Sequence, residues 1–168
     1  MLSRVADALF WMSRYLERAE SMARLVDVCY HLGLDLQGLV TGPHEMHWTT
    51  LLAILQQPGP KHDPSKGATE SQITEWLTFD SGNPNSIVSC VSRARDNARS
   101  IRGSISSMMW RELNKLYWHL KDSNFNELAH ESPHEFYQTV EHGSWQFQGV
   151  CDATLSHDEG WHFIQLGK

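Results

Sequence analysis

Residues 2–28, LSRVADALFWMSRYLERAESMARLVDV, decide the fold class. Apolar side chains recur through this stretch and up to residue 30 at alternating steps of three and four: Leu2, Val5, Leu9, Met12, Leu16, Ala19, Ala23, Val26 and Tyr30. Such steps place side chains on one face of an α-helix, whereas a strand would alternate with a period of two. The spacing predicts a long helix over residues 3–32, which Gly33 and Gly38 weaken further on.

A second apolar series predicts another long helix in the middle of the chain. It also steps by four and three and consists of Ile87, Val91, Ala94, Ala98, Ile101, Ile105 and Met108. We expect one helix from Pro84 to beyond Met108, bent at Gly103. The apolar face continues through Trp110 and Leu120 toward Lys121.

Capping patterns predict where the other helices begin. The expected starts are Pro43 with Glu45, the capping box Thr69–Gln72, Asn83–Pro84, Ser132–Pro133, and the box Ser156–Glu159. Residues 58–68, rich in Pro and Gly, are the expected main loop. No Val/Ile/Thr-rich alternating run is present. The chain is therefore expected to be all-α, an antiparallel bundle of five or six helices.

Length and composition limit the possible functions. The 168 residues, 40% of them hydrophobic, suffice for one domain with a sizeable core. A net charge of −6 argues against nucleic-acid binding. Three separated cysteines, Cys29, Cys90 and Cys151, favour a reducing cytoplasm over a disulfide framework or a zinc ribbon. We expect no membrane span, because no run of about 18 apolar residues occurs.

Two charged stripes flank the two predicted apolar faces. The acidic stripe follows the first face by one position and contains Ser13, Glu17, Glu20, Arg24 and Asp27. The basic stripe on the second helix contains Arg95, Arg99 and Arg102. The favoured interpretation is an ion-pair belt that fixes helix register. The alternatives are a polar pocket, in which arginines hold a carboxylate or phosphate and glutamates orient an amine, and a surface without a role.

Metal and nucleophile motifs are weak in this sequence. A di-iron or di-manganese bundle needs glutamates and Glu-x-x-His motifs on several helices, and Glu127–His130 matches that spacing on one helix alone. We expect no metal site and no cofactor. Cys90 and Cys151 lie in apolar context typical of inert core residues. The cluster His157–Glu159 suits a helix cap better than acid–base chemistry.

Four stretches resemble the bacterial alpha-E family, a domain of unknown function: residues 2–28, 83–86, 94–102 and 152–161. The resemblance implies an all-helical, cytoplasmic protein that acts beside ATP-grasp ligase-like and transglutaminase-like proteins in the formation or modification of amide bonds. It carries over no catalytic residue. Arg18 is one of the motif positions that carry over. The other motif positions are the ligand-binding candidates: Arg14, Glu17, Glu20, Arg24, Arg95, Asn97, Arg99, Arg102, His157 and Glu159.

The resemblance also implies that residues 1–168 are the N-terminal part of a longer domain. Family members look longer and contain a second copy of the opening helix, and residues 163–168 align with the start of that helix, residues 9–14. Repeats bury their faces against neighbours, so the exposed apolar flank of one half leads us to expect either self-association or marginal stability.

Three functions are consistent with these patterns. The first is a non-catalytic helical accessory or substrate-presenting partner of an ATP-grasp amide-forming system. The alternative is an enzyme of amide or acyl transfer that uses the Glu and Arg stripes. A di-metal carboxylate bundle is the third.

Overall fold

The computed structural model of the chain describes residues 1–36, 46–61, 67–125 and 132–168. In this described part the secondary structure consists of seven helices without a strand. They are α1 (Ser3–Leu36), α2 (Met46–Ile54), α3 (Glu70–Thr78), α4 (Ile87–Ser100), α5 (Ser107–Asp122), α7 (Pro133–Thr154) and α8 (Glu159–Gly167). The predicted all-α bundle is confirmed.

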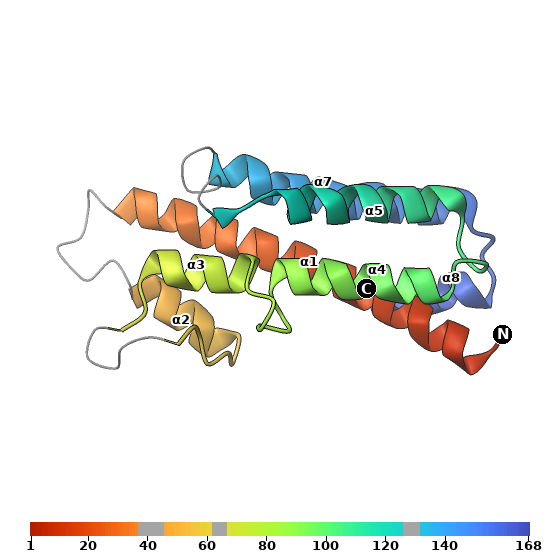
Figure 1. Cartoon of the computed structure of the whole chain (residues 1–168), viewed down its shortest axis with the longest axis horizontal. Helices are drawn as coiled ribbons and strands as arrows, with labels where there is room; N and C mark the ends of the chain where they lie inside the picture. Colours follow the sequence, from red (N-terminus) through yellow and green to blue (C-terminus); the bar gives the residue numbers. More distant parts are fainter. Residues whose placement is uncertain (37–45, 62–66, 126–131) are drawn as a thin grey trace.

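The long helix α1 is the centre of the bundle, as Figure 1 shows. Helices α4, α7 and α8 all pack against it, while α5 packs against α4 and α7. The neighbours α4 and α7 run antiparallel to α1, and α5 runs antiparallel to both of them (Figure 1). Short helices α2 and α3 lie near the far end of α1, away from the N-terminus.

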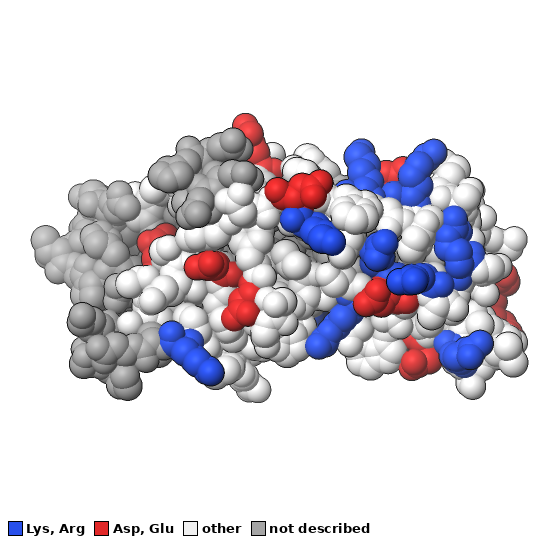
Figure 2. All heavy atoms as spheres, viewed as in Figure 1, with Lys and Arg blue, Asp and Glu red and all other residues white. Residues whose placement is uncertain are grey.

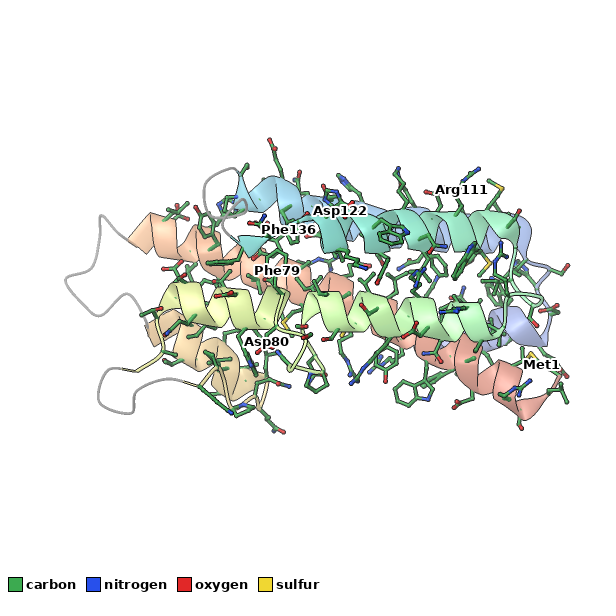
Figure 3. All side chains as sticks on the ribbon, in the orientation of Figure 1. Met1, Phe79, Asp80, Arg111, Asp122 and Phe136 are labelled. Atoms are coloured by element: carbon green, nitrogen blue, oxygen red, sulfur yellow. The ribbon has the colours of Figure 1, made fainter. Side chains whose placement is uncertain are left out.

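The helix predicted over residues 3–32 is confirmed and extends to Leu36. Its predicted apolar face is the main part of the core: Leu9, Met12, Leu16, Ala19, Ala23 and Val26 are all buried. Phe147 and Cys151 of α7 and Ile87 of α4 belong to the same buried cluster. Toward the C-terminal end of α1, Phe79 and Phe136 point toward each other between α3 and α7, with ring centroids 5.4 Å apart (Figure 3).

The prediction of one helix from Pro84 to beyond Met108 is wrong, because the segment forms α4 and α5 with a turn between them. Helix α4 ends at Ser100, and α5 begins after Ser106, whose hydroxyl accepts a hydrogen bond from the Met109 amide at 3.1 Å. Ile101 and Ile105 remain buried across the turn. The apolar spacing therefore continues even though the backbone leaves the helix. This split brings the number of helices above the expected five or six.

The predicted caps have mixed outcomes. The box at Thr69 is confirmed, with both reciprocal hydrogen bonds present. The start at Pro84 is wrong: Ser86 is the cap, and its hydroxyl accepts from the Ser89 amide. The box at Ser156 is also wrong, since Asp158 caps α8 through the Gly160 and Trp161 amides.

Two further helix starts were predicted, at Pro133 and at Pro43. Helix α7 begins at Pro133 as predicted, without a side-chain cap bond from Ser132. The expected start at Pro43 lies outside the described residues. Within the expected main loop, residues 58–61 and 67–68 lie between α2 and α3 and are not helical.

Helix α8 packs so closely on α1 that a Cβ atom added at Gly167 would lie 2.5 Å from the Phe10 carbonyl oxygen and 2.8 Å from Ser13 Cβ. We expect Gly167→Ala to lower the free energy of unfolding by about 1–2 kcal/mol, in the lower part of the overpacking range because a short helix can shift. Thermal or urea unfolding measures the change.

The matched control is Gly149→Ala, in the middle of α7, where an added Cβ meets no atom within 4 Å. Alanine favours helix over glycine, so this variant should gain about 0.5–1 kcal/mol. Equal effects of the two substitutions would show that close packing at Gly167 has no energetic consequence.

An exposed apolar row lies on α1. Leu25, Val28 and Leu32 are 39%, 58% and 44% exposed and follow one another at steps of three and four. The expected self-association stays a prediction. Light scattering on the purified chain should report a dimer or larger species that Val28→Glu disperses, whereas a monomer at every concentration would contradict it.

Candidate functional site

The acidic stripe of α1 faces α7. We define the α1–α7 seam as the polar side chains that meet between these helices: Glu17, Glu20 and Arg24 of α1 with Glu141, Ser144, Trp145 and Gln148 of α7. The α1 set recurs at steps of three and four, and in the α7 set both Ser144 and Trp145 lie three or four residues from Glu141 and Gln148, so each set occupies one face of its helix. Because the helices run antiparallel, residues late in α7 meet residues early in α1.

Glu20 is the centre of the seam and is 7% exposed. Its Oε2 accepts hydrogen bonds from the Ser144 hydroxyl at 2.7 Å and from Gln148 Nε2 at 3.4 Å. Its Oε1 accepts from Trp145 Nε1 at 2.9 Å and from Arg24 Nη2 at 2.6 Å. Four donors from two helices therefore hold a buried carboxylate, as a buried charge requires.

Glu17 lies one turn earlier and is less enclosed. Its Oε1 accepts a hydrogen bond from Gln148 Nε2 at 2.5 Å. Partial burial, followed by repulsion from the Glu20 carboxylate, raises the pKa of Glu17 above its usual 4.5. The seam thus holds two neighbouring carboxylates that share the Gln148 amide but differ in environment.

The raised pKa of Glu17 predicts a pH dependence of stability. Because the pKa of Glu17 is higher in the folded chain than in the unfolded chain, protonation of Glu17 stabilises the folded chain. This contribution to the free energy of unfolding is fully present below pH 4.5 and is lost as pH rises through the raised pKa. We expect Glu17→Gln to be more stable than the unaltered chain at pH 7, with the difference shrinking toward pH 4. Urea unfolding across this range measures it, and a constant difference would contradict the assignment.

The other charged residues of α1 extend the contacts of the stripe. Arg24 Nε lies 3.8 Å from a carboxylate oxygen of Glu141. Arg14 donates to the Lys168 carbonyl oxygen at 3.3 Å. Arg18 is not part of the seam. Its Nη1 donates a hydrogen bond at 3.0 Å to the side chain of Asn85, which lies just before α4.

The basic stripe lies on α4 and in the turn after it, and Arg95 and Arg102 contact α5 instead of the acidic stripe. Arg95 Nε donates to Asn114 Oδ1 at 2.7 Å, and the guanidinium lies 4.3 Å from the Tyr117 ring centroid. Arg102 lies 5.1 Å from the Trp110 ring centroid, and Arg99 is exposed. Figure 2 shows Lys and Arg side chains gathered over the part of this face that α4 and α5 occupy.

The expected belt between the two stripes is not seen in the described part of the chain, where no ion pair joins α1 to α4. Arg95 and Arg102 instead make cation–π contacts with aromatic rings of α5, and Arg95 also donates to the Asn114 side-chain amide oxygen.

The remaining candidates lie elsewhere. The Asn97 side chain donates to the Arg93 carbonyl oxygen at 2.9 Å within α4. His157 contacts the Trp161 ring, with centroids 4.4 Å apart, and Glu159 pairs with the N-terminal amine at 2.9 Å. The structure therefore groups Glu17, Glu20 and Arg24, and joins Asn97, His157 and Glu159 to other neighbours.

Burial excludes the two core cysteines from an open nucleophilic site. Cys90 and Cys151 are buried free thiols, and burial raises their pKa to about 11 and about 12. Thiols with such values remain protonated near neutral pH and are poor nucleophiles. The di-metal motif Glu127–His130 lies outside the described residues.

The α7 side of the seam was not predicted from the sequence. Ser144 and Gln148 are four residues apart on one helical face, and this spacing is the available signal. It is weak, because polar residues at this spacing are common on solvated helix faces.

Comparison with known proteins gives a family and a size relation. Two mycobacterial proteins named as uncharacterised, from Mycobacterium bovis and Mycobacterium tuberculosis, are 30% and 29% identical to the chain, over 98% of the chain and 20% of each relative. The chain thus spans about a fifth of the length of these relatives. No solved structure matches it. In the described part, no helix is both long and apolar enough to cross a membrane.

The sequence profile of Alpha-E, described as a predicted alpha-helical domain with a conserved ER motif, matches residues 1–168. The single Glu-Arg dipeptide of this sequence is Glu17–Arg18. Its two side chains reach opposite neighbours, Gln148 on α7 and Asn85 before α4. Fold and sequence agree, and the chain belongs to the Alpha-E family.

Proposed function

We propose that this chain is a helical partner of an ATP-grasp ligase-like protein, which it serves as an accessory or substrate-presenting subunit in amide-bond formation. The proposed system includes a transglutaminase-like protein as a second partner. The proposal includes a cytoplasmic location. The family resemblance supplies the class of these partners.

The observation that carries this proposal is the α1–α7 seam, where Glu20 accepts four hydrogen bonds and the neighbouring Trp145 stays 48% exposed. In the mycobacterial relatives the matching segment is about one fifth of the polypeptide. The saturated Glu20 carboxylate and the protonated core thiols also favour binding over catalysis.

The exposed edge of the α1–α7 seam is the surface that we propose for the contact. Trp145 is 48% exposed while its indole nitrogen donates to buried Glu20. A tryptophan held by one hydrogen bond, with half of its surface free, is the type of residue that dominates binding interfaces.

The test is co-expression with an ATP-grasp ligase-like protein, followed by co-purification and an assay of amide formation. We expect a complex, and a ligase activity that falls when the chain is left out. Activity unchanged by omission would refute the accessory role. Trp145→Ala should weaken the complex, whereas Trp118→Ala, on α5 and also 48% exposed, should not.

The alternative is an enzyme of amide or acyl transfer. The raised pKa of Glu17 beside Glu20 favours this alternative, because a carboxyl group with such a pKa suits proton transfer. Glu17→Gln and Glu20→Gln would then abolish turnover while the circular dichroism spectrum stays helical. Turnover that survives both changes would leave the seam with a structural or binding role.

A further inference from the structure

Three metal-ligating side chains converge at the far end of the α1–α7 interface, outside the seam. Asp27 and His31 lie four residues apart on α1, and His134 is the second residue of α7. One ligand atom from each lies within 4.8 Å of the other two. His134 is more than 100 positions away from Asp27 and His31 in the chain, so the packing of α7 on α1 makes the cluster.

The distances within the cluster match those of a metal site. His134 Nδ1 lies 2.9 Å and 3.0 Å from the two Asp27 carboxylate oxygens and 3.3 Å from His31 Nε2. His31 Nε2 lies 3.6 Å from Asp27 Oδ1. Nitrogen and oxygen ligands about 2.0–2.1 Å from a tetrahedral zinc ion lie roughly 3.3 Å from one another.

Hydrogen bonding alone satisfies this cluster poorly. A neutral imidazole carries its hydrogen on one ring nitrogen and a lone pair on the other. His134 Nδ1 faces both carboxylate oxygens and the His31 nitrogen, but it has at most one hydrogen to offer. A cation at the centre would be met by a lone pair from each residue.

The buried carboxylate of Asp27 also favours a bound cation. Asp27 is 8% exposed, and its ion pairs within the described residues are with the two histidines. A buried carboxylate is costly without a cationic partner. A divalent ion would provide it.

We propose that Asp27, His31 and His134 bind a divalent transition metal ion of the zinc type. Two imidazoles and one carboxylate suit zinc, and calcium or magnesium would require more oxygen ligands. Three protein ligands leave a fourth position for water or a small anion. The side chains of His31 and His134 are 48% and 42% exposed, so the ion can enter from solvent.

The test uses the full chain, purified without an affinity tag and stripped with a chelator. Zinc chloride is titrated in competition with a chromophoric chelator, and cobalt(II) is added in a separate experiment. We expect one zinc ion per chain and the intense visible absorption of tetrahedral cobalt. Asp27→Asn, His31→Ala and His134→Ala should each lower zinc affinity by more than about tenfold, the smaller end of the loss caused by removing an outer-shell partner.

The matched control is His142→Ala, an exposed histidine also on α7 whose ring contacts Trp145. It should bind zinc as the unaltered chain does. His31 is half exposed, so its replacement leaves the core intact and keeps the test valid if Asp27→Asn fails to fold. Equal zinc affinity in the unaltered chain and His31→Ala, an equal loss in His142→Ala, or octahedral cobalt spectra would each overturn the proposal.

Discussion

Replacing Glu20 with alanine is expected to lower the free energy of unfolding by about 2–3 kcal/mol, because it leaves buried donors without an acceptor. The Ser144 hydroxyl is fully buried and donates to Glu20 Oε2. Trp145 and Arg24 are exposed and can turn to water, so their lost hydrogen bonds contribute less. Urea unfolding followed by circular dichroism measures the change.

The control for Glu20→Ala is Glu75→Ala on α3. Glu75 is exposed, and its replacement should change stability by less than about 0.5 kcal/mol. A similarly small effect at Glu20 would mean that the four hydrogen bonds are replaced by water without loss. Glu20→Gln should fall between the two, because the amide oxygen still accepts from Ser144 while the attraction of Arg24 is gone.

The division between stability and function follows from the same contacts. Glu20 contributes to the seam from inside, where its carboxylate fixes the orientation of Trp145. Replacing Glu20 should therefore weaken partner binding in two ways: it lowers the stability of the folded chain, and it frees the Trp145 ring from its fixed orientation on the surface. Trp145→Ala separates these effects, because it removes the exposed ring and leaves Ser144 and Gln148 on the carboxylate.

The periodic parts of the fold are predictable from the sequence, and the interruptions are not. Helix α1 follows its apolar spacing because every turn from Leu9 to Val26 is buried. The turn between α4 and α5 cannot be predicted from apolar spacing, because buried Ile101 and Ile105 keep helical spacing while the backbone changes direction. Burial alone does not require a continuous helix, and the Ser106 cap was the competing signal.

Of the candidate site, one half is predictable. The acidic stripe of α1 appears in the sequence because helical periodicity places Glu17, Glu20 and Arg24 on one face. Which helix covers that face is decided by tertiary packing, and α7 lies more than 100 residues away in the chain. The spacing of Asp27 and His31, four residues apart on α1, is visible in the sequence but was not singled out, and the sequence gives no sign that His134 lies beside them.

Phe147→Ala is expected to cause the largest loss of stability, about 3–5 kcal/mol, because it opens a cavity in the core between α7 and α1. Phe147 is buried among the apolar residues of the main cluster. Trp145, two residues earlier on the same helix, has the larger side chain but is 48% exposed. Its replacement by alanine loses one hydrogen bond and partly solvated surface, so we expect a loss of about 1–1.5 kcal/mol.

This pair of substitutions tests what α7 contributes to function. If Trp145 belongs to the contact with the ligase-like partner, Trp145→Ala should weaken the complex more than its small loss of stability accounts for. Phe147→Ala should weaken it only as far as the chain unfolds, and binding should return at a temperature where the variant is folded. Binding measured by calorimetry alongside the unfolding curve of each variant distinguishes the two. A parallel decline of binding and stability in both variants would mean that α7 supports the bundle and that the partner binds elsewhere.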